Sequence, residues 1–318
     1  MKKTLVTVVG AGNMGFNHAR VLKSIGNLDK IVEKDPSRRE YLESIYGDQT
    51  VVESIKDSDS DAYVIATPTS THFNIAKNLL ENGKHILVEK PVCMNILEAE
   101  ELTKIAKLAN KVVSVGHVER FNPVVDYLGE WIKNKSLKTI ETYRLSSMPQ
   151  QINDVGVFKD LGIHDVDVVL SLIASKVKSV YAVSSEKNGR DVYTKASITF
   201  ENGACAFITT SWLSTSKTRK IYVSTDKIDA EMDYLKQSFE TKKINIDPGE
   251  NHFKPQSFHN IEKIELKRME PLLLQAKNFI NAIENSENPK VGIAQATEAL
   301  KIVECVLESV LKKKVIWL

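Results

Sequence analysis

The chain has 318 residues, of which 42% are apolar and 26% are charged, and its formal net charge is +2 at pH 7. This length is sufficient for two domains with separate cores, and the composition is typical of a soluble globular protein. Because the net charge is small, a strong general attraction to nucleic acid or to an anionic membrane is excluded.

The cysteines and the apolar runs indicate where in the cell we expect the protein. Cys93, Cys205 and Cys305 lack the spacing of a metal site or of a disulfide framework. We therefore expect no bound metal and a reducing, cytoplasmic location. The apolar run Leu5–Val9 ends at Gly10, which is too short for a secretory signal, and no run reaches the length of a transmembrane helix. We expect no membrane and no nucleic acid among the partners.

The first 117 residues alternate between short apolar runs and stretches with the period of an amphipathic helix. Such alternation predicts parallel strands joined by crossover helices, which is the arrangement of a doubly wound sheet. Strands are expected at residues 4–9, 30–35, 61–67, 85–90 and 112–117, and helices at residues 16–26, 38–47, 72–83 and 96–111.

After about residue 120 the pattern changes to strands that follow one another, which predicts a mainly antiparallel sheet. The Asn-Gly pair in Glu201–Gly203 favours a tight hairpin turn, and we interpret the polar residues 236–262 as loops. Strands are expected at residues 138–147, 177–187, 193–200, 204–213 and 219–226, and helices at residues 123–134, 164–174, 271–286 and 294–312. The predicted fold class is α/β, with a doubly wound Rossmann domain over residues 1–118. An α+β domain with a large, mostly antiparallel open sheet is expected over residues 119–318.

Three glycines interrupt "VTVVGAGNMGFNHAR" just after the first predicted strand. Gly10, Gly12 and Gly15 fit the pattern G-x-G-x-x-G between a strand and a helix, which is the context of a dinucleotide-binding loop. In that loop the first glycine permits the tight turn and the second lets the backbone approach the pyrophosphate. The third lets the helix pack closely on the strand. The helix N-terminus then offers unpaired N–H groups to the phosphates.

An acidic residue is expected about twenty residues after the glycines, where it accepts hydrogen bonds from the ribose hydroxyls. Asp35 occupies this place, with Glu33 as the alternative. A carboxylate there repels a 2′-phosphate, so NAD is the expected cofactor. Arg38 and Arg39 weaken the preference over NADP, because either could pair with a phosphate.

Three further stretches carry candidate chemical groups. "ATPTSTH" (residues 66–72) and "VEKP" (residues 88–91) follow predicted strands, at the carboxyl edge where a doubly wound sheet binds its ligands. "DLGIHDVD" (residues 160–167) opens a helix, on which the first aspartate and the histidine can face the same way. Ordinary structural roles stay open for each: the lysine could point to solvent, the histidine could be a cap or a core residue, and the aspartates could stabilise the helix N-terminus.

The motifs "GAGNMG", "ATPTSTH", "EKP" and "DLGIHDVD", in this order over essentially the whole chain, resemble the glucose–fructose oxidoreductase / inositol dehydrogenase (Gfo/Idh/MocA) family. The resemblance implies NAD(P)-dependent oxidation or reduction at a carbinol carbon, usually of a sugar, an inositol or a sugar nucleotide. It implies that Lys90 and His164 are the catalytic pair with Asp160 as their polar partner. It also implies a cis peptide bond before Pro91 and a homodimer or homotetramer packed through the C-terminal sheet.

A narrower resemblance concerns the substrate. "VGHVERFNP" (residues 115–123) and "INDVGVFKDLGIHDVD" (residues 152–167) are similar to UDP-N-acetylglucosamine 3-dehydrogenases. This implies NAD-dependent oxidation of the 3-hydroxyl of UDP-N-acetylglucosamine to the 3-keto sugar nucleotide. Arg120 would then contact the diphosphate and Asn122 a hydroxyl or acetamido group, although packing at the domain junction stays open for both. Gln151–Ile152 stands where that group carries Arg-Ile, which removes one charge.

In the reaction so implied, His164 is the expected general base, because its ordinary pKa of about 6.5 lets it accept a proton at neutral pH. Lys90 stabilises the developing alkoxide, Asp160 orients the imidazole or holds a substrate hydroxyl, and the lysine and histidine could exchange roles. The expected cofactor-binding residues are Gly10, Ala11, Gly12, Asn13, Met14, Gly15, Asp35, Arg39, Thr67, Pro68, His72, Glu89 and Lys90. The expected substrate-binding residues are Lys90, Arg120, Asn122, Asp160 and His164. The alternatives are a dehydrogenase of the same family for a UDP-uronic acid, a free sugar or an inositol, and a non-catalytic NAD(H)-binding sensor.

Overall fold

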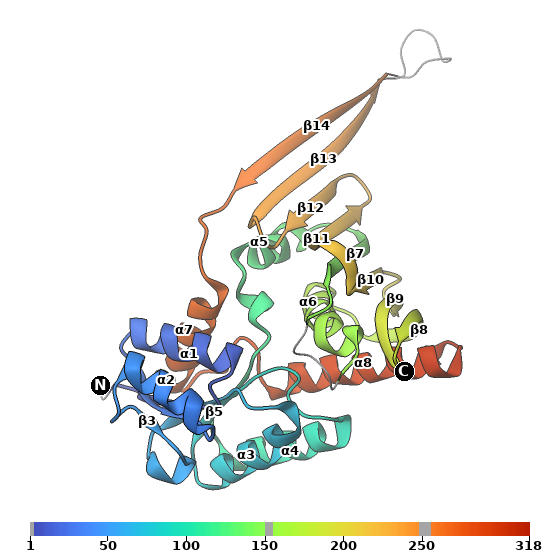
Figure 1. The fold of residues 1–318 in the computed structure, drawn as a ribbon. Helices are drawn as coiled ribbons and strands as arrows, with labels where there is room; N and C mark the ends of the chain where they lie inside the picture. The colour runs from blue at the N-terminus through green and yellow to red at the C-terminus, as the bar shows by residue number, and fades with distance from the viewer. Residues whose placement is uncertain (1–2, 150–154, 248–255) are drawn as a thin grey trace. The chain divides into compact units, whose positions relative to one another are not determined.

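The computed structural model describes residues 3–149, 155–247 and 256–318. The chain forms two compact units, whose elements Figure 1 shows in chain order. One unit runs up to Phe121 and takes in Glu270–Lys301, and the other comprises Asn122–Met269 and Ile302–Leu318. The chain therefore returns to its first unit after building most of the second. A single boundary between residues 118 and 119, as expected from the sequence, does not include this return.

The first unit contains a six-stranded parallel sheet in the order β3-β2-β1-β4-β5-β6. This order, with its crossover between β1 and β4, is that of a Rossmann fold, which confirms the predicted doubly wound sheet. All residues of β1 and β4 are buried, as expected for central strands covered on both faces. The strands are β1 (Val6–Val9), β2 (Leu28–Val32), β3 (Val51–Val52), β4 (Ala62–Ile65), β5 (His85–Val88) and β6 (Val113–Val115).

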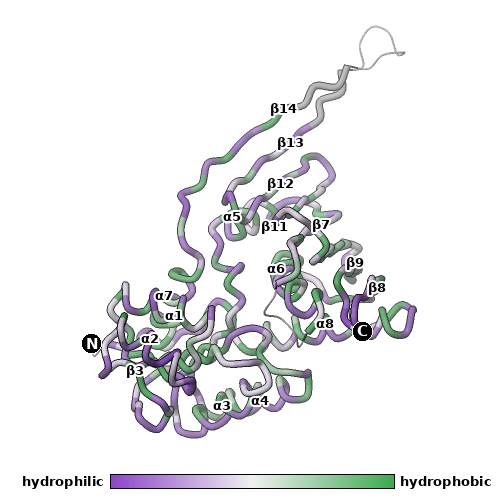
Figure 2. Tube along the Cα trace, in the orientation of Figure 1, coloured by the Kyte–Doolittle hydropathy of each residue, from purple (hydrophilic) through white to green (hydrophobic). Residues whose placement is uncertain are grey.

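Helices cover the two faces of this sheet and form a separate apolar core on each. One core joins the strands to α3 and α4, and the other joins them to α1 and α7. Apolar and polar residues alternate along these helices (Figure 2), as the amphipathic pattern predicts. The returning helix α7 contributes Phe279 and Ile280 to the core that also contains Leu22 of α1, so burial of its apolar face explains the return of the chain. The helices are α1 (Asn13–Ser24), α2 (Pro36–Tyr46), α3 (Thr69–Glu81), α4 (Ile96–Ala109) and α7 (Pro271–Glu284), with 3-10 turns at Ile55–Asp57 and Val118–Phe121.

The second unit is built on a nine-stranded sheet in the order β14-β13-β12-β11-β7-β10-β9-β8-β15. Its neighbours are antiparallel except for β7 and β10, which confirms the predicted, mostly antiparallel sheet. The predicted hairpin at Glu201–Gly203 joins β9 to β10, and Gly203 has the positive φ of +85° that such a turn requires. The strands are β7 (Leu137–Ser147), β8 (Val177–Lys187), β9 (Arg190–Phe200), β10 (Cys205–Ser211), β11 (Leu213–Thr225), β12 (Asp229–Asp233), β13 (Ser238–Asp247), β14 (Gln256–Glu265) and β15 (Ile316–Trp317). The helices are α5 (Pro123–Ile132), a π-helical turn (Phe158–Gly162) and α6 (Ile163–Leu172), and α8 (Ile293–Lys312) contributes residues to both units.

The interpretation of residues 236–262 as loops was wrong for most of that stretch, because β13 and β14 form a long antiparallel pair there. The sequences of the two strands are mostly polar and lack a clear apolar alternation, so they resembled loops. Charged side chains pair across the ladder instead: Glu240 lies opposite Lys263, and their charged atoms are 3.8 Å apart. Phe239 is deeply buried, at 1% exposure, and its ring meets those of Tyr127 and Trp131. Residues 248–255 lie outside the described residues.

Candidate active site

The glycine loop joins β1 to α1, and its three glycines meet different surroundings. Gly10 has a φ of +85°, and a Cβ on it would lie 2.8 Å from Cγ2 of Thr67 and 3.0 Å from the carbonyl oxygen of Ala66. A Cβ on Gly15 would lie 1.9 Å from the carbonyl oxygen of Gly10. A Cβ on Gly12 would meet no atom within 4 Å. The turn and the close packing thus require the outer two glycines, whereas the middle glycine faces open space.

The N-cap residue of α1 provides no side-chain cap. Gly12 precedes the helix and supplies no side chain, and no acidic residue stands in the first turn. Gly12, Asn13 and Met14 are exposed, whereas Ala11 is buried. The positive end of the helix dipole at this terminus favours an anion. The open space above Gly12 and the missing side-chain cap at this residue fit the pyrophosphate of a dinucleotide.

The acidic residue that borders this loop is Glu33, the first residue after β2. Its Oε2 accepts a hydrogen bond of 2.9 Å from the N–H of Ala11, and its Oε1 accepts one of 3.0 Å from the N–H of Asp35. Asp35 instead caps α2, because its Oδ1 accepts a hydrogen bond of 2.9 Å from the N–H of Arg38. The geometry favours Glu33 over Asp35 as the acid beside the cofactor loop. The capping role of Asp35 could have been predicted from the sequence, since an aspartate followed by a proline, here Pro36, is typical of a helix start.

The two arginines of α2 are bound to the backbone near this acid. Nε of Arg38 donates to the carbonyl oxygen of Ala11 at 3.0 Å, and its guanidinium carbon lies 4.9 Å from the ring centre of Tyr41. Nη1 of Arg39 donates to the carbonyl oxygen of Glu33 at 3.1 Å. Arg39 therefore holds the turn between β2 and α2, and Arg38 joins α2 to the glycine loop.

Replacing Glu33 by glutamine tests which acid holds the ribose. We expect E33Q to weaken NAD binding by about tenfold or more, because charge-assisted hydrogen bonds to the ribose hydroxyls are lost. It should also reduce the discrimination against NADP. The matched control is D35N, which should bind NAD normally because asparagine caps a helix as well as aspartate does. Fluorescence titration of each variant with NADH and NADPH measures the affinities. Weak binding by D35N alone would show that Asp35, and not Glu33, binds the ribose.

His72, which is 1% exposed, contacts both the segment that follows β4 and the segment that follows β5. Its Nδ1 lies 3.0 Å from the carbonyl oxygen of Pro91, and its Nε2 lies 2.9 Å from that of Thr67. Burial lowers the pKa of His72 although both carbonyls act to raise it. The peptide bond between Lys90 and Pro91 is cis, in agreement with the family resemblance. Pro68 is exposed, whereas Lys90 and Thr67 are half-buried at this edge of the sheet.

The second unit carries Asp160 and His164 on one continuous helical segment. Asp160 lies in the π-helical turn that runs directly into α6, so the helix begins earlier than the predicted start at residue 164. The turn is held by Phe158, whose N–H donates to Oδ2 of Asp191 at 2.8 Å. A Cβ on Gly162 would lie 2.7 Å from the buried ring of Phe158. A π-helical turn is frequent at functional sites, and here it spaces the two candidate polar groups.

A buried ion pair next to His164 was not anticipated from the sequence. Arg144 of β7 donates from Nε to Oδ2 of Asp165 at 2.8 Å and from Nη2 to Oδ1 at 2.9 Å. The two side chains are 3% and 2% exposed. The guanidinium carbon lies 5.1 Å from the ring centre of Tyr234. The pair therefore fixes the first turn of α6, where His164 stands.

Replacing Arg144 by methionine should destabilise the second unit by about 3–5 kcal/mol, because Asp165 is left as an uncompensated buried charge. The double variant R144M/D165L removes both charges, and we expect it to recover most of the lost free energy of unfolding. Urea unfolding followed by circular dichroism measures both variants. A single variant as stable as the parent protein would show that the pair does not hold α6.

The remaining substrate candidates lie where the chain passes from the first unit to the second, between Phe121 and Asn122. Arg120 is half-buried in the 3-10 turn that ends the first unit. Asn122 is 3% exposed and caps α5, since its Oδ1 accepts from the N–H of Val124 at 3.4 Å. Its Nδ2 donates to the carbonyl oxygen of Tyr234 at 3.2 Å. Asn122 therefore has the contacts of a packing residue. Lys90 and Arg120 belong to the first unit, and Asn122, Asp160 and His164 to the second. Gln151–Ile152 lies outside the described residues.

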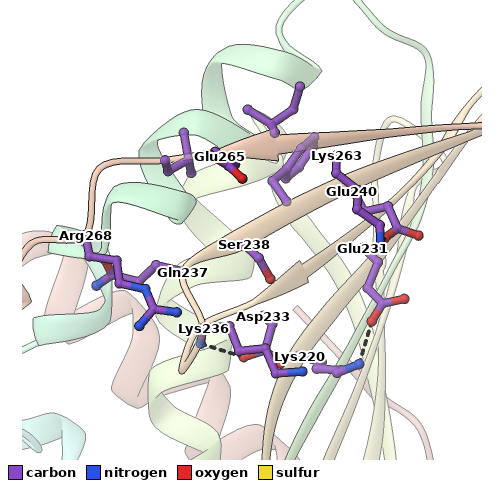
Figure 3. Close-up of a pocket in the computed structure, with 13 residues that line it drawn as sticks. Lys220, Glu231, Asp233, Lys236, Gln237, Ser238, Glu240, Lys263, Glu265 and Arg268 are labelled. Carbon is purple, nitrogen blue, oxygen red and sulfur yellow. Dashed lines mark hydrogen bonds and ion pairs between the residues drawn. The ribbon is translucent and has the colours of Figure 1, made fainter.

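A hollow of about 570 Å³ opens over β11, β12, β13 and β14 in the second unit (Figure 3). Its lining mixes both signs of charge, and Lys220 pairs there with Glu231. None of the residues expected to bind cofactor or substrate lines it. Within the described ranges, no helix is long and apolar enough to cross a membrane, and no group of three or more His, Cys, Asp or Glu side chains could hold a metal ion.

Known proteins similar to this chain agree with the fold and with the glycine loop. Residues 4–117 match the model of an oxidoreductase family with an NAD-binding Rossmann fold, and residues 143–230 match the Gfo/Idh/MocA C-terminal domain. The UDP-N-acetylglucosamine 3-dehydrogenase of Acidithiobacillus ferrooxidans is 27% identical over 282 residues, which is 87% of each chain. A solved structure of that enzyme has a TM-score of 0.88 at 24% identity and 98% coverage of both chains.

Two proteins of Bacillus subtilis are also similar. The uncharacterized oxidoreductase YrbE is 30% identical over 237 residues, covering 66% of this chain and 68% of its own. The scyllo-inositol 2-dehydrogenase (NAD(+)) is 28% identical over 191 residues, covering 54% of this chain and 55% of its own. The fold and the glycine loop, together with these relatives, define an NAD-dependent dehydrogenase that acts on an alcohol carbon. The chain belongs to the Gfo/Idh/MocA oxidoreductase family.

Proposed function

We propose that this protein oxidises the 3-hydroxyl of UDP-N-acetylglucosamine to a ketone with NAD. The observation that carries the proposal is the similarity to the Acidithiobacillus ferrooxidans 3-dehydrogenase, which extends over 87% of each chain and so includes most of both units. Arg120, Asp160 and His164 supply cationic, acidic and basic groups suited to a diphosphate and to a sugar hydroxyl.

Each polar group has one role in the proposed reaction. Bound NAD supplies the acceptor for the hydride that leaves the sugar carbon. The first turn of α1 binds the pyrophosphate, Glu33 binds the adenosine ribose, and Thr67 and Pro68 border the cofactor. His164 takes the proton of the 3-hydroxyl, Asp160 orients its imidazole, and the ammonium of Lys90 stabilises the developing alkoxide.

Two other functions make different use of the same residues. A dehydrogenase for an inositol is favoured by the similarity to the scyllo-inositol enzyme, but that similarity covers only 54% of this chain. A UDP-uronic acid or a free sugar would use the same catalytic groups. A non-catalytic NAD(H) sensor needs the glycine loop and Glu33, and has no use for Lys90, Asp160 and His164 at its site.

The proposal includes a homodimer or homotetramer formed through the sheet of the second unit. Supporting it, Tyr181 and Val183 of β8 are 42% and 51% exposed, and Tyr222 of β11 is 38% exposed. Light scattering after gel filtration measures the assembly, and a monomer would contradict it. A cytoplasmic location suits the free thiols of Cys93, Cys205 and Cys305.

The test incubates the pure protein with NAD and UDP-N-acetylglucosamine in the presence of hydroxylamine. Hydroxylamine traps the ketone as an oxime, which matters because alcohol oxidation by NAD is unfavourable at neutral pH. Mass spectrometry of the sugar nucleotide should then show the oxime. Oxidation of an inositol, a free sugar or a UDP-uronic acid in its place would identify one of the other dehydrogenases, and no oxidation of any alcohol would favour the sensor.

A further inference from the structure

The carboxylate of Glu89 is enclosed directly behind Lys90. Glu89 follows the last residue of β5 and is 6% exposed. Its Oε2 accepts a hydrogen bond of 3.2 Å from the backbone N–H of Lys90. A Cβ on Gly116 would lie 2.7 Å from Oε2 and 2.8 Å from Oε1, so the carboxylate lies against the backbone of the chain after β6. Glu89 was expected to bind the cofactor, but these contacts use its carboxylate inside the first unit.

The other contact of this carboxylate comes from the helix that follows the glycine loop. Oε1 of Glu89 lies 2.7 Å from Nε2 of His18, which is 1% exposed in α1. His18 stands three residues after Gly15, within the first two turns of the helix whose N-terminus fits the pyrophosphate. The buried pair of His18 and Glu89 thus joins α1, the helix beside the cofactor loop, to the backbone of Lys90.

The balance of charges keeps this carboxylate ionised. Burial raises the pKa of Glu89, but the hydrogen bond and charge of His18, together with the charge and N–H of Lys90, outweigh it and lower the pKa. The third titratable neighbour is His72 of α3, whose pKa the charge of Glu89 acts to raise. Without His18, burial would be opposed by the charge and N–H of Lys90, so the pKa of Glu89 would rise.

We propose that His18 and Glu89 are a positioning pair, which fixes the backbone at Lys90 relative to α1 and so sets where the lysine ammonium meets the substrate hydroxyl. The inference rests on the proposed function, since it takes Lys90 as the catalytic lysine. It gives the histidine after the glycine loop a role in turnover that is separate from holding the cofactor. Neither residue touches the reacting atoms.

The experiment compares E89Q, H18L and the conservative H18Q, whose amide nitrogen can occupy the place of the imidazole Nε2. We expect E89Q and H18L to lower kcat by about tenfold or more, since small misplacements of catalytic groups are costly. The Kd for NADH should stay within about threefold, and H18Q should restore a large part of kcat. The double variant E89Q/H18L should be no worse than the poorer single variant, because both remove one contact. The matched control is H85Q, at the other end of β5, which should keep normal turnover.

A second measurement does not depend on the substrate. Acetylation of the free protein, read by mass spectrometry, reports the reactivity of Lys90 relative to the other lysines. E89Q alters the carboxylate that accepts the backbone N–H of Lys90, so the lysine should change its position and its labelling should differ from that of the parent protein by about threefold or more, whereas H85Q should leave it unchanged. If UDP-N-acetylglucosamine is not oxidised, kcat is measured with whichever alcohol of the panel reacts, and the labelling result still stands.

Three results would overturn the positioning role. Folded E89Q and H18L could retain kcat and Lys90 labelling within twofold of the parent protein. The Kd for NADH could rise as much as kcat falls, which would make the pair a support for the cofactor helix alone. H85Q could show the same losses. If E89Q or H18L fails to fold, as judged by circular dichroism, H18Q decides: a loss of kcat of about tenfold or more in correctly folded H18Q would then contradict the proposal.

Discussion

Replacing Lys90 by methionine is expected to lower kcat by about a thousandfold while the affinity for NAD changes by less than about threefold. Methionine keeps the length of the side chain but removes the ammonium that stabilises the alkoxide. The backbone should stay in place, because Glu89 binds the N–H at this position whatever side chain it carries. Single-turnover kinetics with NADH fluorescence measures the chemical step, and a binding titration measures the cofactor.

Two further variants, K84M and H164A, show whether the loss of turnover is specific to the proposed catalytic groups. Lys84 precedes β5 and pairs with the exposed Asp59 at 2.6 Å, so K84M removes the same chemical group near the other end of the strand. We expect normal turnover from it, because a surface pair contributes little. H164A should lose about a hundredfold or more in kcat through loss of the general base. Turnover near normal in both K90M and H164A would exclude the proposed mechanism.

Replacing Gly15 by alanine is expected to raise the Kd for NAD by about a hundredfold and to destabilise the first unit by about 2 kcal/mol or more. The added methyl carbon would lie 1.9 Å from the carbonyl oxygen of Gly10, so α1 must move away from β1. That movement displaces the N–H groups that fit the pyrophosphate. Calorimetric titration with NAD and thermal unfolding measure the two effects.

Gly12 provides the contrast, because a Cβ there meets no atom within 4 Å and the residue has a φ of −62°. G12A should therefore be as stable as the parent protein or more stable by about 0.5 kcal/mol, since alanine restricts the unfolded chain. It should still bind NAD poorly, because the methyl group occupies the space of the pyrophosphate. Normal NAD binding by G12A would show that the cofactor does not approach this backbone.

The Rossmann sheet could be predicted from the sequence because its signal is local. Each buried strand is a short apolar run, and the spacing of the three glycines between a strand and a helix marks the loop. The return of α7 to the first unit could not be predicted, because an amphipathic helix does not specify the sheet on which its apolar face packs. β13 and β14 were missed for a related reason: their charged residues are stabilised by partners on the opposite strand.

The candidate site shows the same division between local and tertiary signals. Asp35 was preferred over Glu33 by spacing alone, although its proline neighbour marks it as a helix cap. The ion pair of Arg144 and Asp165 and the pair of His18 and Glu89 join residues 21 and 71 positions apart, and no local pattern indicates such contacts. Buried charges of this kind are placed by the tertiary fold.

The most direct test of the proposed function follows the hydrogen itself. The protein is incubated with NAD and UDP-N-acetylglucosamine that carries deuterium at C3, and the NADH formed, including any that stays bound, is weighed by mass spectrometry after denaturation. We predict that the NADH is heavier by one deuterium, and that substrate labelled at C4 gives NADH of ordinary mass. Label transferred from C4, or no NADH from either sugar nucleotide although NAD is bound, would contradict oxidation at the 3-hydroxyl.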